Sequence, residues 1–186
     1  MIKQDIFIEK IVKKRKTSKD FALIGLLIFA IPFLFFILLQ VGAMLGEEAS
    51  IFIVRISLPL FVGIIYLVYR LISGMNAEFE YIATNEDLTI DKIIARRKRK
   101  RLYNGSCKNF TILAPVSDRS FQTNKTNRVK ILDYSSGVEN PNRWFLITKK
   151  DKEQIMIIFE PDDRLIQIFR RYNPRALLQA GITANS

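Results

Sequence analysis

The sequence has no histidine and only one cysteine, Cys107, among its 186 residues. Without histidine the usual general base and the commonest metal ligand are missing, and Ser/His or Cys/His nucleophile pairs are excluded. A single cysteine excludes an internal disulfide bond, so nothing points to an oxidising compartment. A glycine-rich phosphate loop is also absent from the sequence. We therefore expect no catalytic residues, no metal and no cofactor, and the sequence predicts that the protein is not an enzyme.

Charge is missing from two long apolar stretches. Residues 21–46 contain no charged side chain, and the second stretch is interrupted only by Arg55. A helix of about 20 apolar residues crosses the hydrocarbon core of a bilayer. The pattern predicts a transmembrane helical hairpin over residues 21–75, with spans at about 21–45 and 51–72.

Basic residues set the expected orientation of this hairpin. They cluster before the first span, whereas the turn Gly46–Ser50 carries two acids and no base. Since Lys and Arg remain on the cytoplasmic side, we expect a multi-pass cell-membrane protein with both termini in the cytoplasm. A secretory signal peptide cleaved after Ala43 is the alternative, but its apolar region is about 7–15 residues long, which favours a retained anchor.

The N-terminal segment, residues 1–20, is basic and amphipathic. Drawn as a helix, residues 7–12 place their apolar side chains on one face and leave lysines on the other. A helix of this composition lies on an anionic membrane surface, although an ordinary basic flank of a span explains the same residues equally well. The candidate membrane-surface residues are Lys10, Lys13, Lys14, Arg15 and Lys16.

Past Met75 apolar and polar residues alternate, which predicts strands. We expect one strand to run through Lys92–Ala95 into Lys100–Tyr103, and another over Cys107–Ala114. Short turn-forming segments separate these from later strands. Cys107 is expected to be a buried structural thiol, because a lone cysteine in a strand is more often core than nucleophile.

One amphipathic helix follows the strands. It is expected to begin after Pro161, where two acids complement the helix dipole, and to end at Asn173-Pro174. The predicted fold is an α+β membrane protein, in which the transmembrane hairpin precedes a small antiparallel β barrel or sandwich with a C-terminal helix. This domain is expected at residues 76–175, followed by a tail at 176–186.

The order of a strand meander, basic residues and a terminal helix resembles the pleckstrin-homology-like domains of bacterial membrane proteins. More specific strings are Tyr81–Asn85, Leu88–Ile94, Arg96–Arg101, Asp133–Gly137 and Phe169–Arg175. Together they resemble a family of small two-span membrane proteins from clostridia and their relatives, classed as a domain of unknown function. The resemblance covers nearly the whole chain and implies a cytoplasmic pleckstrin-homology-like module. It implies no activity, because none is established for that family.

Six consecutive basic residues form the strongest local signal: Arg96, Arg97, Lys98, Arg99, Lys100 and Arg101. A central strand would bury about half of them, which is prohibitive without partners, so the run is expected at a hairpin tip or on an edge. Phosphate groups are natural ligands for such side chains, and the cytoplasmic leaflet supplies them as anionic lipid. A solvated run that serves solubility and topology, or a site for a phosphorylated ligand, remains open. Nucleic acid is not expected, because no aromatic residues interleave the run.

The sequence therefore favours a non-catalytic membrane-surface adaptor that contacts anionic lipid headgroups through its basic residues. The alternative is a protein-interaction subunit of a larger membrane complex, such as a transporter or an envelope machine. The expected partners are anionic membrane lipids, with a protein partner or a second copy of the chain left open.

Overall fold

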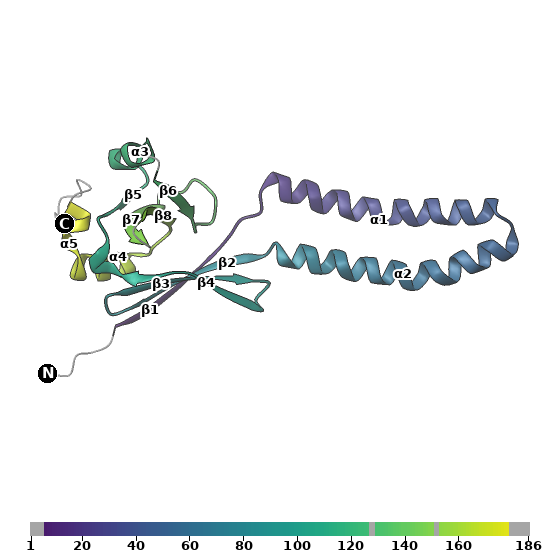
Figure 1. Ribbon diagram of the computed structural model, residues 1–186, viewed down its shortest axis with the longest axis horizontal. Helices are drawn as coiled ribbons and strands as arrows, with labels where there is room; N and C mark the ends of the chain where they lie inside the picture. Colours follow the sequence, from purple (N-terminus) through teal and green to yellow (C-terminus); the bar gives the residue numbers. More distant parts are fainter. Residues whose placement is uncertain (1–5, 127–128, 151–152, 179–186) are drawn as a thin grey trace. The chain divides into compact units, whose positions relative to one another are not determined.

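The computed structural model describes residues 6–126, 129–150 and 153–178, which fall into two compact units (Figure 1). One unit, the helical hairpin, covers residues 16–76. The other, which we call the β domain, combines the segment up to Arg15 with the chain from Ala77 onward. The β domain therefore contains chain from both sides of the hairpin, which the expected boundary at residue 76 did not include.

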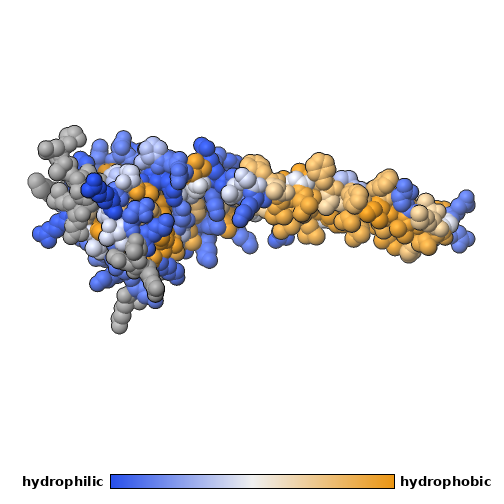
Figure 2. Space-filling model, turned by 90° about the horizontal axis from the view of Figure 1, so that it is seen from above, coloured by the Kyte–Doolittle hydropathy of each residue, from blue (hydrophilic) through white to orange (hydrophobic). Residues whose placement is uncertain are grey.

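The helical hairpin consists of α1, Ser18–Met44, and α2, Glu47–Gly74. Both helices are long and apolar enough to cross a membrane, and almost none of their most apolar residues is buried within the protein. A core helix of a soluble protein would bury one face, so this exposure favours contact with lipid. Figure 2 shows the same feature as a largely hydrophobic surface over the hairpin. The expectation of two long apolar helices is confirmed.

The two helices pack against each other near both the middle and the turn. The rings of Phe35 in α1 and Phe61 in α2 lie 4.7 Å apart. Nearer the turn, Gly42 faces Ile53, and a β-carbon at Gly42 would lie 3.4 Å from the Ile53 side chain. The small residue thus permits a close approach of the helices, as small residues do at the interfaces of membrane helices.

The β domain contains two four-stranded sheets. Sheet A is antiparallel and has the order β1-β2-β3-β4. Its strands are β1 (Phe7–Lys13), β2 (Ala77–Thr84), β3 (Asp87–Ile94) and β4 (Lys98–Ser106). The first and second strands are separated in sequence by the whole helical hairpin, yet they pair over their full length.

Sheet B has the order β5-β7-β8-β6, and β6 runs parallel to β8. Its strands are β5 (Ile112–Pro115), β6 (Lys130–Asp133), β7 (Trp144–Lys150) and β8 (Glu153–Phe159). A short 3₁₀ turn, η1 (Cys107–Asn109), leads into this sheet. The helices of the domain are α3 (Arg119–Thr126), α4 (Asp163–Tyr172) and α5 (Pro174–Leu178).

The main core of the β domain is shared by the two sheets and α4. The ring of Tyr81 in sheet A meets that of Phe159 in sheet B edge to face at 5.7 Å, and Phe159 in turn lies 6.1 Å from Phe169 in α4. The described strands form two open sheets around this core. The sandwich alternative is therefore confirmed, and the closed barrel is not formed.

Asn173 ties the C-terminal helices to the start of sheet B. Its side-chain amide donates to the carbonyl oxygens of Cys107 and Phe110, both at 2.9 Å, and its side-chain oxygen accepts from the backbone of Ala176. The predicted helix end at Asn173 is confirmed for α4. The chain then continues into α5, whose Ala176 and Leu177 are buried, so a tail beginning at residue 176 is wrong for the described residues.

Two further expectations need correction. The N-terminal segment is not an amphipathic helix: its described residues form β1, because the backbone groups of Phe7–Lys13 pair with β2. Cys107 is buried as expected, but it lies in η1 rather than in a strand. Residues 1–5 of the expected N-terminal segment, residues 151–152 of an expected turn, and residues 179–186 of the expected tail lie outside the described residues.

Candidate anionic-surface site

The basic run begins in the tight turn that joins β3 to β4. The backbone N–H of Arg97 donates to the carbonyl of Ile94 at 3.0 Å, and the two residues between them, Ala95 and Arg96, have positive φ angles of 51° and 55°. This left-handed conformation suits glycine or asparagine and costs other residues about 1 kcal/mol each. The Arg96 side chain is 81 % exposed, and its Nε lies only at the limit of ion-pair distance, 4.0 Å, from Glu78. The structure thus holds an arginine at a projecting and strained position.

The rest of the run lies on β4, which is an edge strand, as expected from the cost of burying its charges. On one face of sheet A, which we call the outer face, Arg99 contacts Glu80 at 2.9 Å and Arg101 contacts Asp91 at 3.3 Å. The side chains of these two acids are only 3 % and 2 % exposed. Because a buried unpaired carboxylate is unfavourable, the two arginines serve as counterions within the domain.

Lysines occupy the opposite face of the same strand. Lys98 and Lys100 alternate with the arginines, and both are exposed. Lys100 lies directly opposite Lys92 of β3, on the face that also carries the buried Phe79. None of these three lysines has a carboxylate partner within the described residues. Like charges directly opposite each other are destabilising, so this cluster of Lys92, Lys98 and Lys100, the lysine cluster, favours an external anion.

The basic residues of the N-terminal segment also divide into one that acts within the domain and others that are exposed. Lys10 lies on β1, where its charge acts on Asp162 at the start of α4. Burial alone would raise the pKa of Asp162, but hydrogen bonds from Leu165 and Arg164, together with the positive charges of Arg164 and Lys10, lower it overall. Lys10 therefore acts within the domain.

Lys13, Lys14 and Arg15 are exposed at the end of β1, and Lys16 follows them as the first residue of the hairpin unit. The backbone of Lys14 donates to Ala77, and that of Arg15 donates to Ser136, at 2.9 and 2.8 Å. These bonds fix the point at which the chain leaves the β domain.

The two basic groups lie at the same end of sheet A. Lys13 is opposite Glu78, Glu78 is opposite Ile93, and Ile93 is opposite Arg99. The end of β1 and the β3–β4 turn are thus separated by the width of a four-stranded sheet, about 14 Å for three spacings. We call this end, formed by residues 13–15 and 96–98, the basic end of sheet A. It is also the end from which β1 runs toward α1 and at which β2 begins after α2.

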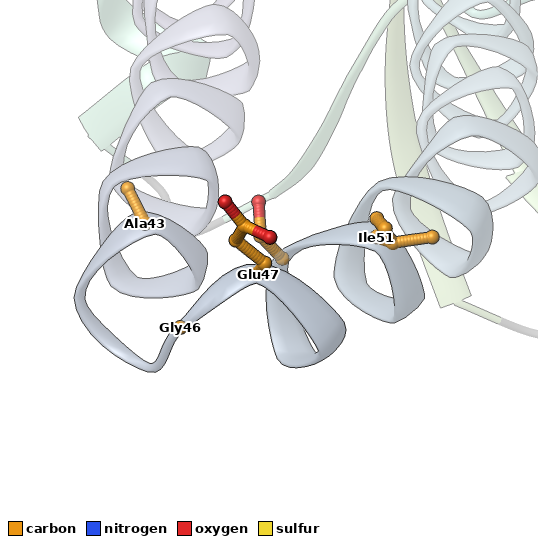
Figure 3. Close-up of a pocket in the computed structure, with 5 residues that line it drawn as sticks. Ala43, Gly46, Glu47 and Ile51 are labelled. Carbon is orange, nitrogen blue, oxygen red and sulfur yellow. The ribbon is translucent and has the colours of Figure 1, made fainter.

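A pocket of about 380 Å³ lies elsewhere, at the turn of the helical hairpin. It is lined by Ala43, Gly46, Glu47, Ser50 and Ile51, and Figure 3 shows the Glu47 carboxylate above the turn, between Ala43 and Ile51. Its polar side chains are the Glu47 carboxylate and the Ser50 hydroxyl, which do not make a set of metal ligands. None of the basic residues that the sequence predicts as site residues lines this pocket.

Catalytic alternatives find no support in the described part of the chain. Burial raises the pKa of the Cys107 thiol to about 12, so the nucleophilic thiolate is scarce at neutral pH. Asp162 caps α4 by accepting from the Leu165 backbone at 2.9 Å, and Glu160 accepts from Ser136 at 2.6 Å. The described residues contain no group of three acids or cysteines placed to hold a metal ion.

Sequence reasoning missed Lys92 and overestimated the free charge of the basic run. The signal for Lys92 was present, because Leu88 and Ile90 set an apolar face with period two and Lys92 continues it. Its partner Lys100 follows once the turn at Ala95–Arg97 fixes the register. The pairing of Arg99 and Arg101 depends on acids from two other strands, which no local pattern reveals.

Residues 4–179 match the family described as Bacterial PH-like domain (DUF6106). No curated protein and no solved structure matches the chain. The match includes both the sheets of the β domain and the two apolar helices between β1 and β2. It supports the resemblance to bacterial pleckstrin-homology-like domains and does not extend to clostridial origin or to the number of membrane spans. The chain belongs to this family of PH-like domains.

Proposed function

We propose that the protein is a non-catalytic membrane-surface adaptor. In this proposal the helical hairpin spans the cell membrane, the β domain lies in the cytoplasm, and the basic end of sheet A contacts anionic lipid headgroups together with the lysine cluster. The lack of histidine, the buried thiol and the absence of a metal-binding group from the described residues support a non-catalytic role.

The observation that carries the proposal is the short connection between the basic end and the helices. β1 ends at Lys13 and α1 begins at Ser18, while α2 ends at Gly74 and β2 begins at Ala77. An extended chain covers at most about 3.6 Å per residue, so these links reach no more than about 18 and 11 Å. If the helices span the bilayer, the ends of β1 and β2 stay within this reach of the helix ends, and the β3–β4 turn lies at most two strand spacings, about 10 Å, farther from the start of β2.

The basic residues at this position are close enough and numerous enough to attract an anionic leaflet measurably. A basic residue near an anionic leaflet contributes about 1 kcal/mol, and the attraction decays over a Debye length of about 8 Å at physiological salt. Arg97, Lys98 and Lys100 have no acidic partner among the described residues, so their charge is available. Arg99 and Arg101 are engaged by buried acids and contribute less.

The proposal is tested with the full-length protein in lipid nanodiscs of two compositions. Trp144 is the single tryptophan, and it can transfer energy to dansyl-labelled lipid headgroups. We expect greater transfer in discs of phosphatidylcholine mixed with phosphatidylglycerol than in phosphatidylcholine alone, and we expect salt to remove the difference. Equal transfer in both compositions at low salt would refute the contact with anionic lipid.

The cytoplasmic location rests on the distribution of basic residues around the hairpin. A green fluorescent protein fused after residue 186 should fluoresce, whereas alkaline phosphatase inserted at Gly46 should be active outside the cytoplasm. The reverse pattern would contradict the orientation while leaving the lipid measurement in nanodiscs unaffected.

A second candidate function, a protein-interaction subunit of a larger membrane complex, is favoured by one feature of β1. Phe7 and Ile11 project from the outer face of this edge strand and are 62 % and 49 % exposed. Crosslinking from native membranes at an Ile11→Cys position should then capture one defined partner. If only the uncrosslinked monomer were recovered, this role would be contradicted.

A further inference from the structure

Two buried carboxylates lie side by side on the outer face of sheet A. Glu80 of β2 is directly opposite Asp91 of β3, and both side chains are almost completely buried. Like charges at opposed positions repel, and burial strengthens the repulsion. Arg99 and Arg101 each reach one oxygen of one acid, so the arginines balance the two charges without satisfying all four carboxylate oxygens.

One of these oxygens is left without a donor. Glu80 Oε1 accepts from Arg99, whereas Glu80 Oε2 is buried and has no hydrogen-bond donor among the described residues. A further carboxyl group on the same face belongs to Glu9 of β1. Glu9 lies two residues from Ile11, which is opposite Glu80, so the two side chains are diagonal neighbours on the same face. A proton between these carboxyl groups would supply the missing donor.

We propose that Glu80 and Glu9 share a proton, and that this proton clamps the edge strand β1 onto β2. The clamp goes beyond the proposed lipid contact and does not depend on it. Its effect falls on the strand that runs directly toward α1. Loss of the proton would place two carboxylates against each other and weaken the hold on β1.

Among the described residues, the charged groups that face this position belong to the four strands of sheet A. They are Glu9 and Lys13 on β1, Glu78 beside Glu80 on β2, Asp91 on β3, and Arg99 and Arg101 on β4. Burial raises the pKa of Glu80, the neighbouring Glu9 side chain and the negative charge of Asp91 raise it further, and Arg99 lowers it. The net direction is upward from the ordinary value of 4.5.

The sign of the pH effect follows from this upward shift. Below the ordinary carboxyl pKa of 4.5 the proton is bound in both the folded and the unfolded chain, and the clamp is fully present. As the pH rises through the higher folded-state pKa, the proton leaves and the clamp is lost. An anionic membrane surface attracts protons as it attracts other cations, so membrane proximity would favour the closed clamp.

Hydrogen exchange of the full-length protein in detergent micelles tests the clamp. Protection of the amides in β1 is divided by that in β8, a strand of the same molecule in sheet B, after correction for intrinsic exchange. We expect this ratio to fall several-fold as the pH is raised from the ordinary carboxyl value of 4.5 toward neutrality, because the pKa of Glu80 is shifted upward from that value. A constant ratio in the natural sequence would overturn the proposal.

Two variants distinguish the proton shared by Glu80 and Glu9 from the titration of acidic residues elsewhere in the protein. In Glu9→Gln the amide donates to Glu80 at every pH, so the ratio should stay high and flat. Glu139→Gln removes an exposed acid outside both sheets and should keep the fall. A fall that persists in Glu9→Gln would overturn the proposal. Glu80→Gln should also give a flat ratio where it folds, and the Glu9→Gln result decides the question where it does not.

Discussion

The two faces of strand β4 carry the same sign of charge and differ in what surrounds it. Arg99 and Arg101 reach across the outer face to buried acids, whereas Lys98 and Lys100 on the other face have no acidic partner within the described residues. The alternation of a strand sorts neighbouring residues of one run into two environments. A polybasic run is therefore not a uniform patch, and its members must be assigned one at a time from the register of the sheet.

The largest expected effect comes from removing a paired arginine. Arg101→Ala leaves Asp91 buried and unpaired, which costs about 3–5 kcal/mol in a fully buried pair. Because the Arg101 side chain is 62 % exposed, water screens part of this interaction, and we expect a loss of about 2 kcal/mol of unfolding free energy. Denaturant unfolding followed by Trp144 fluorescence measures the change.

Lys100→Ala is the matched control, since it removes the same charge from the adjacent position of the same strand. We expect it to change the unfolding free energy by less than about 0.5 kcal/mol. Equal losses of unfolding free energy in Arg101→Ala and Lys100→Ala would contradict the distinction between a paired and an unpaired face of β4.

Substitutions on the face with unpaired lysines should weaken the attraction to lipid and leave stability little changed. Lys98→Ala combined with Lys100→Ala should weaken attraction to an anionic surface by about 2 kcal/mol, or roughly 30-fold, at about 1 kcal/mol per residue. The energy transfer from Trp144 to labelled phosphatidylglycerol discs should fall accordingly, with stability little changed. Lys130→Ala combined with Lys149→Ala, two exposed lysines of sheet B, should leave the transfer unchanged.

These assignments show how far the sequence reaches. The apolar spans, the amphipathic helix from Asp163 to Tyr172 and several strands follow from periodicity, because each depends on a local pattern. The pairing of β1 with β2 does not, since its two strands lie on either side of about sixty residues of hairpin. A basic amphipathic segment has the same composition whether it lies on a membrane or completes a sheet.

The candidate site was predictable to a similar degree. Its location at a hairpin tip and edge strand follows from the cost of burying charge. The neutralisation of Arg99 and Arg101 does not, because Glu80 and Asp91 are separated from them in sequence and meet them only through the register. The period-two pattern places Lys92 on the face of Leu88 and Ile90, but its position opposite Lys100 depends on the β3–β4 turn.

The turn residue Arg96 sharpens the comparison, because it combines a weak ion pair with a strained backbone. Arg96→Gly relieves the left-handed strain and should raise the unfolding free energy by about 0.5 kcal/mol, after allowing for the greater freedom of glycine in the unfolded chain. It should also reduce the transfer to anionic discs. Ala95→Gly relieves similar strain without removing charge, so it should stabilise the domain and leave the transfer intact. A loss of stability in both variants would show that the turn is not strained.

Lys92→Gln gives the smallest expected change in stability and tests the lysine cluster most directly. Its charge opposes that of Lys100 across the strand pair, so its removal should stabilise the domain by about 0.3 kcal/mol, within the range for opposed like charges. High salt screens the same repulsion and should abolish this gain. In anionic discs the variant should show less energy transfer from Trp144, because the Lys92 side chain, which opposes stability, is also available to a phosphate. Unfolding at low and high salt, beside energy transfer in the same buffers, measures both effects. If Lys92→Gln changed neither, the face with unpaired lysines would be a solvated surface, and the contrast with the paired arginines would reflect fold stability alone.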